Sequence, residues 1–213
     1  MLFRSDLPGV DHPSVVTYAD LLAGRATAGE RVAVVGAGGI GVDVSHFLTH
    51  VDTDLEGWKA RWGVADPAEH RGGLTDKDLP VPARRVWLLQ RKTTPIGTGL
   101  GKTSGWAHRL NLRDAGVQQL TGVTYERVDD EGLHLTVAGE AVEGEEAGRT
   151  SMVLDVDTVV LCAGQESVRD LVDELEALGD DGPSVHVIGG ADVAAELDAE
   201  RAIRQGTELA SRL

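Results

Sequence analysis

Short apolar runs that end in glycine recur along the chain, and they alternate with segments whose apolar positions fall at helical spacing. Valine and leucine dominate the apolar runs, which is typical of strands buried on both faces of a parallel sheet. The predicted strands cover residues 32–35, 85–92, 155–162 and 185–188. The predicted helices cover residues 13–23, 42–49, 106–115, 167–178 and 199–213. This alternation predicts an α/β fold with a Rossmann-like parallel sheet.

Two segments interrupt the alternation. Residues 51–82 are rich in glycine, proline and aspartate, and within them Trp58 and Trp62 lie four apart on a predicted short helix. A Rossmann unit needs only a short connection at this point, and a long one is usually functional or partly disordered. Further on, residues 123–128 and 133–137 flank an Asp-Asp-Glu-Gly turn and predict a β-hairpin.

The first predicted strand runs directly into glycines with the Gly-x-Gly-x-x-Gly spacing of a dinucleotide-binding motif. Gly36 makes the tight turn, Gly38 lets the backbone approach a pyrophosphate, and Gly41 lets the following helix pack close to the strand. The pyrophosphate then lies at the helix N-terminus, where free N–H groups and the helix dipole favour negative charge. The residues expected to bind the dinucleotide here are Gly36, Ala37, Gly38, Gly39, Ile40 and Gly41.

The end of the second predicted strand indicates which dinucleotide is bound. NAD sites carry an acidic residue about 20 positions after the motif for the ribose 2′-hydroxyl, whereas NADP sites carry cations for the 2′-phosphate. This strand ends in Gln90, Arg91 and Lys92, without a carboxylate. Because arginine pairs with phosphate through two parallel hydrogen bonds, the sequence favours NADPH. The alternative is that Arg91 and Lys92 are solvated charges at a strand end.

The distribution of charge supports a phosphorylated ligand. The chain has 20 lysine and arginine residues against 35 aspartate and glutamate residues, a net charge of -15. Residues 81–113 nevertheless contain no acid, and a cationic island attracts a phosphorylated ligand through its local field. Its cations are Arg84, Arg85, Arg91, Lys92, Lys102, Arg109 and Arg113. Nucleic acid is excluded as a partner because its binding needs many phosphate contacts and the rest of the chain is strongly acidic.

Residues 93–105 form a predicted glycine-rich loop, in which Gly101-Lys-Thr103 is similar to part of a phosphate-binding loop. That motif needs a further glycine five residues before Gly101, and Ile96 occupies the position. We therefore expect a flexible cover over the cofactor, with Lys102 near a phosphate, rather than a P-loop.

Composition excludes several other classes of protein. No apolar run approaches the roughly 20 residues that span a bilayer, and the start of the chain lacks the pattern of a secretion signal. We therefore expect a cytoplasmic protein with no membrane partner.

The single cysteine, Cys162, cannot form an internal disulfide or a cysteine-rich metal or iron-sulfur site, and its apolar strand predicts a buried thiol. The acidic residues Glu143, Glu145 and Glu146 predict a solvated loop, so no metal site is expected.

Taken together, these residues resemble the C-terminal third of bacterial NADPH-dependent 2,4-dienoyl-CoA reductases, in a flavin and iron-sulfur class that includes trimethylamine dehydrogenase. The resemblance covers nearly everything from Gly9 onward, and the long segment 51–82 also fits it. Its most specific stretches are Gly36-Ala-Gly-Gly-Ile-Gly41, Leu89-Gln-Arg-Lys92, Gly99-Leu-Gly-Lys-Thr-Ser-Gly-Trp106, Cys162-Ala-Gly-Gln-Glu166 and Ile188-Gly-Gly-Ala-Asp-Val-Ala-Ala-Glu-Leu-Asp-Ala199.

For the fold, this resemblance implies an NADPH domain inserted into a glutathione-reductase-like FAD domain. Residues 1–28 would end the first FAD segment, residues 29–163 would form the NADPH domain, and residues 164–213 would be the C-terminal FAD segment. The residues implied to contact FAD are Ala163, Gly164, Gly189, Gly190 and Asp192. Related flavoproteins often carry aspartate at the position of Gly190. Asp192 lies two residues further on, where a carboxylate can accept a hydrogen bond from a ligand hydroxyl or cap a turn.

The resemblance also implies the chemistry. NADPH delivers a hydride to FAD, and a 4Fe-4S cluster and FMN in an N-terminal portion outside this chain carry electrons to an unsaturated fatty acyl-CoA in β-oxidation. Since the cofactors carry this chemistry, no catalytic side chain is expected here, and the chain alone is expected to be inactive. One alternative is the same portion of another flavin and iron-sulfur reductase, such as an enoate reductase or an amine dehydrogenase. Another is a non-catalytic NADP-binding regulatory module.

Overall fold

The computed structural model describes residues 7–139, 148–164, 166–179, 182–194 and 199–213. The chain divides into two compact units, with the division between Ala163 and Gly164. Among the described residues, the first unit contains both β-sheets and the glycine motif, and the second contains two helices.

A five-stranded parallel sheet forms the centre of the first unit, with the strand order β1-β8-β2-β3-β4. Its strands are β1 (Val15–Thr17), β2 (Arg31–Val35), β3 (Arg85–Leu89), β4 (Gln118–Leu120) and β8 (Thr158–Leu161). The central strands β8, β2 and β3 are almost completely buried, as their runs of valine and leucine predict. The predicted α/β fold with a Rossmann-like parallel sheet is therefore confirmed.

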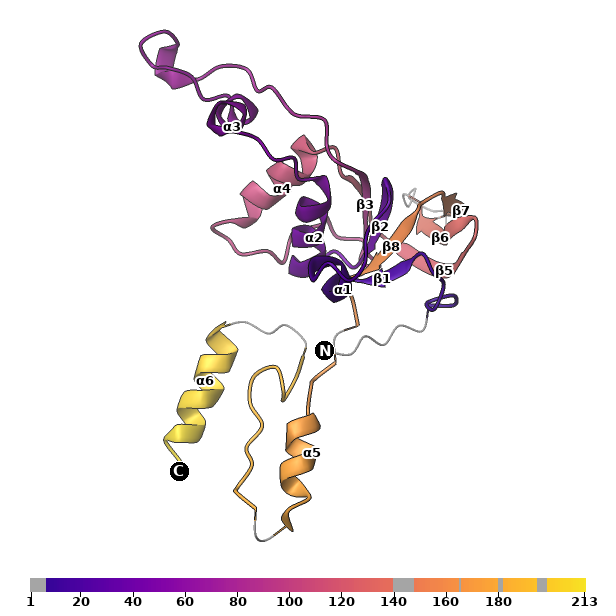
Figure 1. Ribbon diagram of the computed structural model, residues 1–213, viewed down its shortest axis with the longest axis vertical. Helices are drawn as coiled ribbons and strands as arrows, with labels where there is room; N and C mark the ends of the chain where they lie inside the picture. Colours follow the sequence, from indigo (N-terminus) through magenta and orange to yellow (C-terminus); the bar gives the residue numbers. More distant parts are fainter. Residues whose placement is uncertain (1–6, 140–147, 165, 180–181, 195–198) are drawn as a thin grey trace. The chain divides into compact units, whose positions relative to one another are not determined.

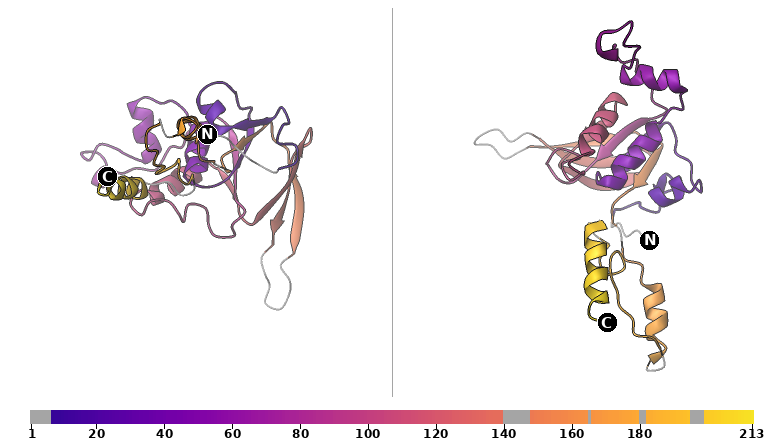
Figure 2. Two further views of the ribbon diagram at one scale, coloured as in Figure 1. Left: turned by 90° about the horizontal axis from the view of Figure 1, so that it is seen from below. Right: turned by 90° about the vertical axis from the view of Figure 1, so that its left-hand side faces the viewer.

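The two faces of this sheet bury different partners because successive side chains on a strand point in opposite directions. Val32 and Val34 of β2 face the helices α2 (Gly39–Thr49) and α4 (Gly105–Asp114), together with Leu48 and Leu112. Figures 1 and 2 show these two helices on one side of the sheet. Alternate residues of the same strands, Ala33 and Val35 in β2, contribute to a second apolar cluster.

That second cluster lies against a three-stranded antiparallel meander of β5 (Val123–Asp129), β6 (Gly132–Ala138) and β7 (Arg149–Leu154). The first two strands confirm the predicted hairpin of residues 123–128 and 133–137. The third strand, β7, has no counterpart among the predicted strands. Five of the six residues of β7 are exposed, so its sequence lacks the apolar alternation of a half-buried strand. The acidic residues Glu143, Glu145 and Glu146 lie outside the described residues.

The predicted helix over residues 13–23 is wrong in its first half. Val15 and Val16 belong to β1, which pairs in parallel with β8, and the helix α1 spans only Tyr18–Leu22. Two β-branched residues beside an available parallel strand favour sheet over helix. Thr17 then begins the helix, since its side-chain oxygen accepts a hydrogen bond of 3.1 Å from the backbone N–H of Asp20.

The long segment 51–82 contains the expected short helix, α3 (Leu55–Trp62), and a single 3₁₀ turn (Arg71–Gly73). The side chain of Asp54 caps α3 at its start, and the ring centroids of Trp58 and Trp62 lie 6.4 Å apart along it. An ion pair between Lys77 and Asp114, with an N···O distance of 2.6 Å, ties the segment to the last turn of α4. The insertion is thus anchored to the helical side of the sheet.

The second unit contains α5 (Asp170–Glu176) and α6 (Ala199–Ala210), near the two predicted helices 167–178 and 199–213. The predicted strand over residues 185–188 is wrong, because this segment has no regular secondary structure. A strand needs a neighbour to pair its backbone N–H and C=O groups. Among the described residues of this unit there is no other strand to provide one.

Arg31 at the start of β2 is bonded to two aspartates that precede β8. Its Nη2 lies 2.7 Å from Asp157 Oδ1, its backbone N–H donates to Asp157 Oδ2 at 2.8 Å, and its Nη1 bonds Asp155. The hydrogen bonds from Arg31 hold the pKa of the Asp157 carboxyl below its ordinary value. This network joins the amino ends of two neighbouring strands of the parallel sheet.

We expect Asp157→Asn to lower the Tm at neutral pH by about 2–4 °C, as for a favourable but solvent-screened ion pair in a chain of this size. Because the pKa of Asp157 is lowered by folding, its stabilising effect is present above the unfolded pKa of about 3.9 and is lost as pH falls through the lower folded pKa. Thermal unfolding of the wild type and the variant between pH 3 and pH 7 should therefore show a difference in Tm that becomes smaller as the pH falls. Glu126→Gln, at an exposed position, is the matched control, and a pH-independent difference would contradict the ion-pair explanation.

Candidate nucleotide-binding site

The carboxyl ends of three neighbouring parallel strands, β8, β2 and β3, meet at one edge of the sheet. Backbone hydrogen bonds continue from the strands into the segments that follow them, so the residues after each strand also lie side by side. These bonds run from Cys162 N to Val35 O (2.8 Å), from Gly36 N to Leu89 O (3.0 Å) and from Gln90 N to Leu120 O (3.0 Å). In open parallel sheets, ligands bind outside this edge.

Two glycines of the motif are required by the geometry of the turn between β2 and α2. Gly36 has a φ of 107°, which side chains of L-residues rarely tolerate. A Cβ atom on Gly41 would lie only 1.8 Å from the backbone oxygen of Gly36. Helix α2 therefore approaches the end of β2 as closely as the spacing of the motif predicts.

The other two motif glycines face open space. Gly38 precedes α2 as its N-cap residue and Gly39 begins the helix, and a Cβ atom on either would meet nothing within 4 Å. No side chain caps this end of the helix. The first turn of α2 thus offers backbone N–H donors, a favourable dipole and room for a phosphate group, which fits the pyrophosphate of a dinucleotide.

The end of β8 brings Ala163 to the same turn. A Cβ atom on Gly36 would lie 2.9 Å from Ala163 Cβ, so these two residues are in close contact beside the motif. Cys162, which precedes Ala163, is buried as predicted, and burial raises the pKa of its thiol to about 12. This thiol therefore stays protonated at neutral pH and is a poor nucleophile.

Gln90, Arg91 and Lys92 follow β3 directly, and the side chains of Arg91 and Lys92 are exposed. The Gln90 side chain turns back onto the loop: its Nε2 donates to Lys92 O at 3.1 Å and to Thr94 O. On the other side, Gly122 N donates to Lys92 O at 2.9 Å. Hydrogen bonds from the Gln90 side chain and from the Gly122 N–H therefore hold the backbone of the cationic turn, while its charged side chains are exposed.

Tyr125 of β5 lies close enough to Arg91 for the two groups to interact electrostatically. Burial raises the pKa of its phenol, an effect that the positive charge of Arg91 opposes. The hydroxyl group is buried and has no hydrogen-bond partner within the described part of the chain. This contact could not be predicted from the sequence, because a tyrosine on an amphipathic hairpin is typical of a core position.

The expected cover, residues 93–105, is attached to α4 by Arg109, one of the cations of residues 81–113. Arg109 Nη1 donates to Gly97 O at 2.9 Å, and Ile96 is buried. The side chain of Lys102 is exposed beyond this attachment, near the start of α4. Both α2 and α4 follow parallel strands, so their N-termini lie toward the same edge of the sheet.

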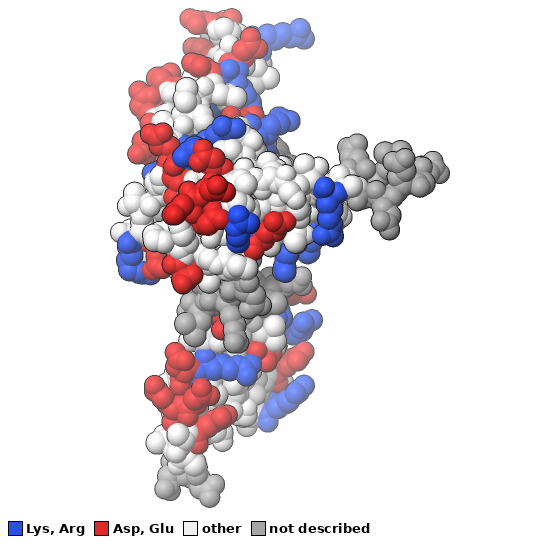
Figure 3. Space-filling model, turned by 90° about the vertical axis from the view of Figure 1, so that its right-hand side faces the viewer, with Lys and Arg blue, Asp and Glu red and all other residues white. Residues whose placement is uncertain are grey.

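The cationic island of residues 81–113 is not one surface. Arg84 and Arg85 precede β3 or begin it, whereas Arg91 and Lys92 follow it, so roughly 20 Å of extended strand separates the two pairs. Arg85 stacks over the ring of Trp87, with 4.5 Å from its guanidinium carbon to the ring centroid. On the face shown in Figure 3, acidic side chains gather in clusters with basic side chains between them. Only the second pair belongs to the candidate site.

In the second unit, one side chain satisfies two groups that the resemblance implies for FAD. Gln205 on α6 accepts a hydrogen bond from Gly189 N through Oε1 at 2.7 Å, and its Nε2 donates to Asp192 Oδ2 at 2.9 Å. The carboxylate of Asp192 is therefore engaged inside its own unit. A flavin that used both groups would have to displace Gln205.

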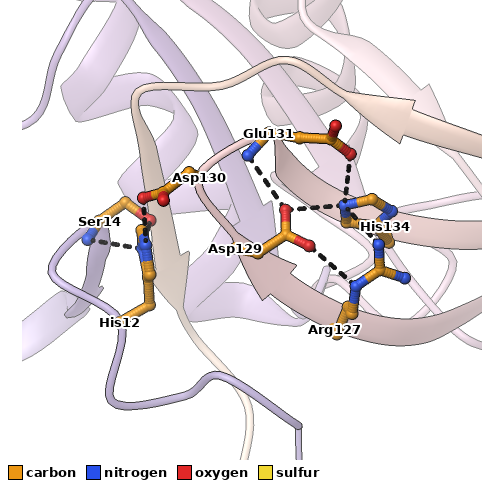
Figure 4. Close-up of polar contacts among 7 residues, drawn as sticks. All are labelled: His12, Ser14, Arg127, Asp129, Asp130, Glu131 and His134. Atoms are coloured by element: carbon orange, nitrogen blue, oxygen red, sulfur yellow. Dashed lines mark hydrogen bonds and ion pairs between the residues drawn. The ribbon is translucent and has the colours of Figure 1, made fainter.

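Asp129, Glu131 and His134 bring potential metal-ligand atoms within 4.8 Å of one another at the β5–β6 turn (Figure 4). Arg127 is also present, and its Nε donates to Asp129 Oδ2 at 2.8 Å, while His134 Nε2 lies 2.8 Å from Asp129 Oδ1. Burial raises the pKa of Asp129, but hydrogen bonds from His134, the Glu131 N–H and Arg127 outweigh it and leave the pKa lowered. The arginine supplies the positive charge that a metal would otherwise bring, so we interpret this cluster as a structural part of the hairpin.

Comparison with known proteins identifies the family. The model of the pyridine nucleotide-disulphide oxidoreductase family matches residues 2–185, and the chain belongs to this family, whose members have an FAD- and NAD(P)-binding α/β fold. A metal reductase of Desulforamulus reducens is 26% identical over 173 residues, which cover 80% of this chain and 24% of that protein.

Solved structures show the same fold. A 2-naphthoyl-CoA reductase aligns with a TM-score of 0.64 and 20% identity over 95% of this chain and 24% of its own. Histamine dehydrogenase from Rhizobium sp. 4-9 aligns with a TM-score of 0.62 and 19% identity over 100% of this chain and 29% of its own. The chain thus spans about a quarter of the length of these relatives. In the parts that the structure describes, no helix is long and apolar enough to span a membrane.

Alanine should destabilise the fold at Gly41 but weaken only nucleotide binding at Gly38. Gly41→Ala forces a Cβ atom into the Gly36 oxygen, so we expect it to lose at least about 3 kcal/mol of stability or to fail to fold. Gly38→Ala has free space around its Cβ and should unfold at nearly the wild-type temperature, yet it should bind a dinucleotide more weakly because the methyl group occupies the phosphate position. Thermal unfolding and nucleotide titration of both variants test this. Equal unfolding temperatures for the two would contradict the close contact.

Proposed function

We propose that this chain is the NADPH-binding portion of a flavin-dependent reductase and that it positions NADPH for hydride transfer to FAD. The observation that carries the proposal is the carboxyl edge of the parallel sheet. There the open N-terminus of α2 follows β2, and the turn with Arg91 and Lys92 follows the neighbouring strand β3. Because neighbouring strands lie about 4.8 Å apart, one ligand can reach both.

The phosphate groups of NADPH have matching groups at this edge. The N–H groups at Gly38 and Gly39 bind the pyrophosphate, and Arg91 and Lys92 pair with the 2′-phosphate. Lys102 lies on the cover and adds a cation near the phosphates. The contribution of this chain is binding and orientation, and no side chain of the site needs to gain or lose a proton during the transfer. When bound, FAD supplies the acceptor for the hydride.

For the whole protein we propose reduction of an unsaturated fatty acyl-CoA, namely a 2,4-dienoyl-CoA in β-oxidation, through a 4Fe-4S cluster and FMN carried by other parts of the polypeptide. Two observations support this substrate class. The stretches at Gly36–Gly41, Leu89–Lys92 and Gly99–Trp106 resemble those of bacterial dienoyl-CoA reductases. In addition, a protein of the same fold over 95% of this chain is a reductase of an aromatic acyl-CoA, 2-naphthoyl-CoA. We place the protein in the cytoplasm.

A second candidate is the same portion of another flavin-dependent oxidoreductase that acts on a different substrate. Histamine dehydrogenase shares the fold at a TM-score of 0.62, and the relative with 26% identity is a metal reductase. The nucleotide-binding role of this chain is the same in either case. The substrate is determined by domains that these residues do not include.

Arg91→Ala should weaken NADPH binding about 10- to 150-fold and leave NADH binding nearly unchanged. A charge-assisted hydrogen bond contributes roughly 1.5–3 kcal/mol, and only NADPH carries the 2′-phosphate that Arg91 is proposed to bind. Because the arginine is exposed, the loss should shrink as the salt concentration rises. Calorimetric titration of the wild type and the variant with both nucleotides measures the effect.

Arg113→Ala is the matched control, since it removes the same charge from the last turn of α4, away from the carboxyl edge. It should leave both affinities unchanged. Equal losses of NADH and NADPH binding in Arg91→Ala, or tighter binding of NADH than of NADPH by the wild type, would show that Arg91 does not bind a 2′-phosphate.

The isolated chain should bind NADPH but should not oxidise it when a 2,4-dienoyl-CoA is added. In the proposed function, the acyl group and the electron carriers bind to other parts of the polypeptide, so this chain alone supplies only the nucleotide site. Loss of NADPH absorbance with and without the acyl-CoA measures this directly. Turnover by the pure chain would show that it contains a complete active site, which would contradict the proposal that other parts of the polypeptide bind the acyl group.

A further inference from the structure

The cationic turn after β3 is held in shape by the side chain of Gln90. Its Nε2 carries two N–H donors, and both are used within the turn: one bonds Lys92 O at 3.1 Å and the other bonds Thr94 O. A single amide group therefore spans the backbone on both sides of Thr93. Such an arrangement fixes a loop that would otherwise sample many conformations.

The second support of the turn comes from the segment before β5. Gly122 N donates to the same Lys92 oxygen at 2.9 Å, and Val123 N donates to Gln90 O at 3.0 Å. Gly122 has a φ of 65°, and a Cβ atom there would lie 3.1 Å from Ala138 Cβ and 3.3 Å from Thr93 Cγ2. Backbone hydrogen bonds thus hold the turn against the meander, and the side chain of Gln90 adds hydrogen bonds within the turn.

These contacts leave the ends of the long side chains unrestrained. The side chains of Arg91 and Lys92 are exposed, so their charged ends owe their position mainly to where the backbone of the turn places them. A turn that is ordered before the ligand arrives does not have to be ordered on binding, which preserves affinity. Only a ligand that contacts the turn, such as one with a 2′-phosphate, binds more tightly because the turn is already ordered.

We propose that Gln90 is a positioning residue that sets the preference for NADPH over NADH. It acts by holding the backbone at Arg91 and Lys92 in place, and its amide nitrogen does not itself bind the 2′-phosphate because both of its N–H groups are already used within the turn. This inference rests on the proposed NADPH-binding function. It adds a residue that governs which nucleotide the site selects.

The test is calorimetric titration of NADPH and NADH into the wild type and Gln90→Met. Methionine keeps the length and approximate volume of glutamine but has no N–H donor. We expect NADPH affinity to fall about 10-fold and NADH affinity to change less than about 2-fold. Gln119→Met is the control, since Gln119 is exposed on the neighbouring strand β4, and it should change neither affinity.

A double-mutant cycle separates positioning from direct binding. If Gln90 acts through Arg91, the two substitutions affect one interaction. The double variant Gln90→Met/Arg91→Ala should then bind NADPH less than about 3-fold more weakly than Arg91→Ala alone. Full additivity of the two losses would overturn the positioning role. Equal losses for NADPH and NADH, or no loss in Gln90→Met, would overturn the inference as well.

Two further arms keep the outcome interpretable. Gln90→Asn retains the amide but shortens the side chain by one methylene group, and it should show the same selective loss if Gln90→Met does not fold. The wild type reports separately on the proposed function: if it binds NADPH no better than NADH, both the function and this inference fail. If it prefers NADPH and the variants of Gln90 keep that preference, the inference alone fails.

Discussion

The close approach of α2 to the end of β2 is the constraint on which the candidate site depends. A Cβ atom on Gly41 would lie 1.8 Å from the Gly36 oxygen, so helix and strand meet at a distance that only glycine permits. This contact places the first turn of α2 directly beyond the carboxyl end of the strand, with Gly38 and Gly39 facing open space. The free N–H groups of the helix are consequently held at the edge where parallel strands end.

The rest of the first unit keeps this edge rigid. Along β2, Val32 and Val34 pack with the helices, while Ala33 and Val35 pack toward the meander, and all four are nearly or completely buried. A strand fixed on both faces cannot slide without moving its side chains to the wrong side. The groups that follow β8, β2 and β3 therefore keep their spacing, which allows separate loops to contribute to one binding surface.

The sequence predicted the parts of this architecture whose local signal agrees with the tertiary environment. The glycine motif, the buried strands and the first hairpin have strong patterns, and the structure contains them. The missed elements have weak or misleading patterns. Val15 and Val16 lie at helical spacing with later residues but pair with β8, and β7 is an exposed edge strand with little apolar alternation. Such choices depend on which partner strand is near, and the sequence alone does not state this.

The candidate site shows the same division between chemistry and placement. Residue types predict a 2′-phosphate contact for Arg91 and Lys92, since cations at the end of this strand suit that group. The supports of their turn could not be predicted, because the bond from Gly122 N to Lys92 O joins residues 30 positions apart and follows from the packing of the meander. In a chain with a net charge of -15, the long-range field repels a phosphorylated ligand. At physiological salt that repulsion is screened beyond about 8 Å, so we expect the position of two cations on a fixed turn to affect NADPH binding more than the total charge does.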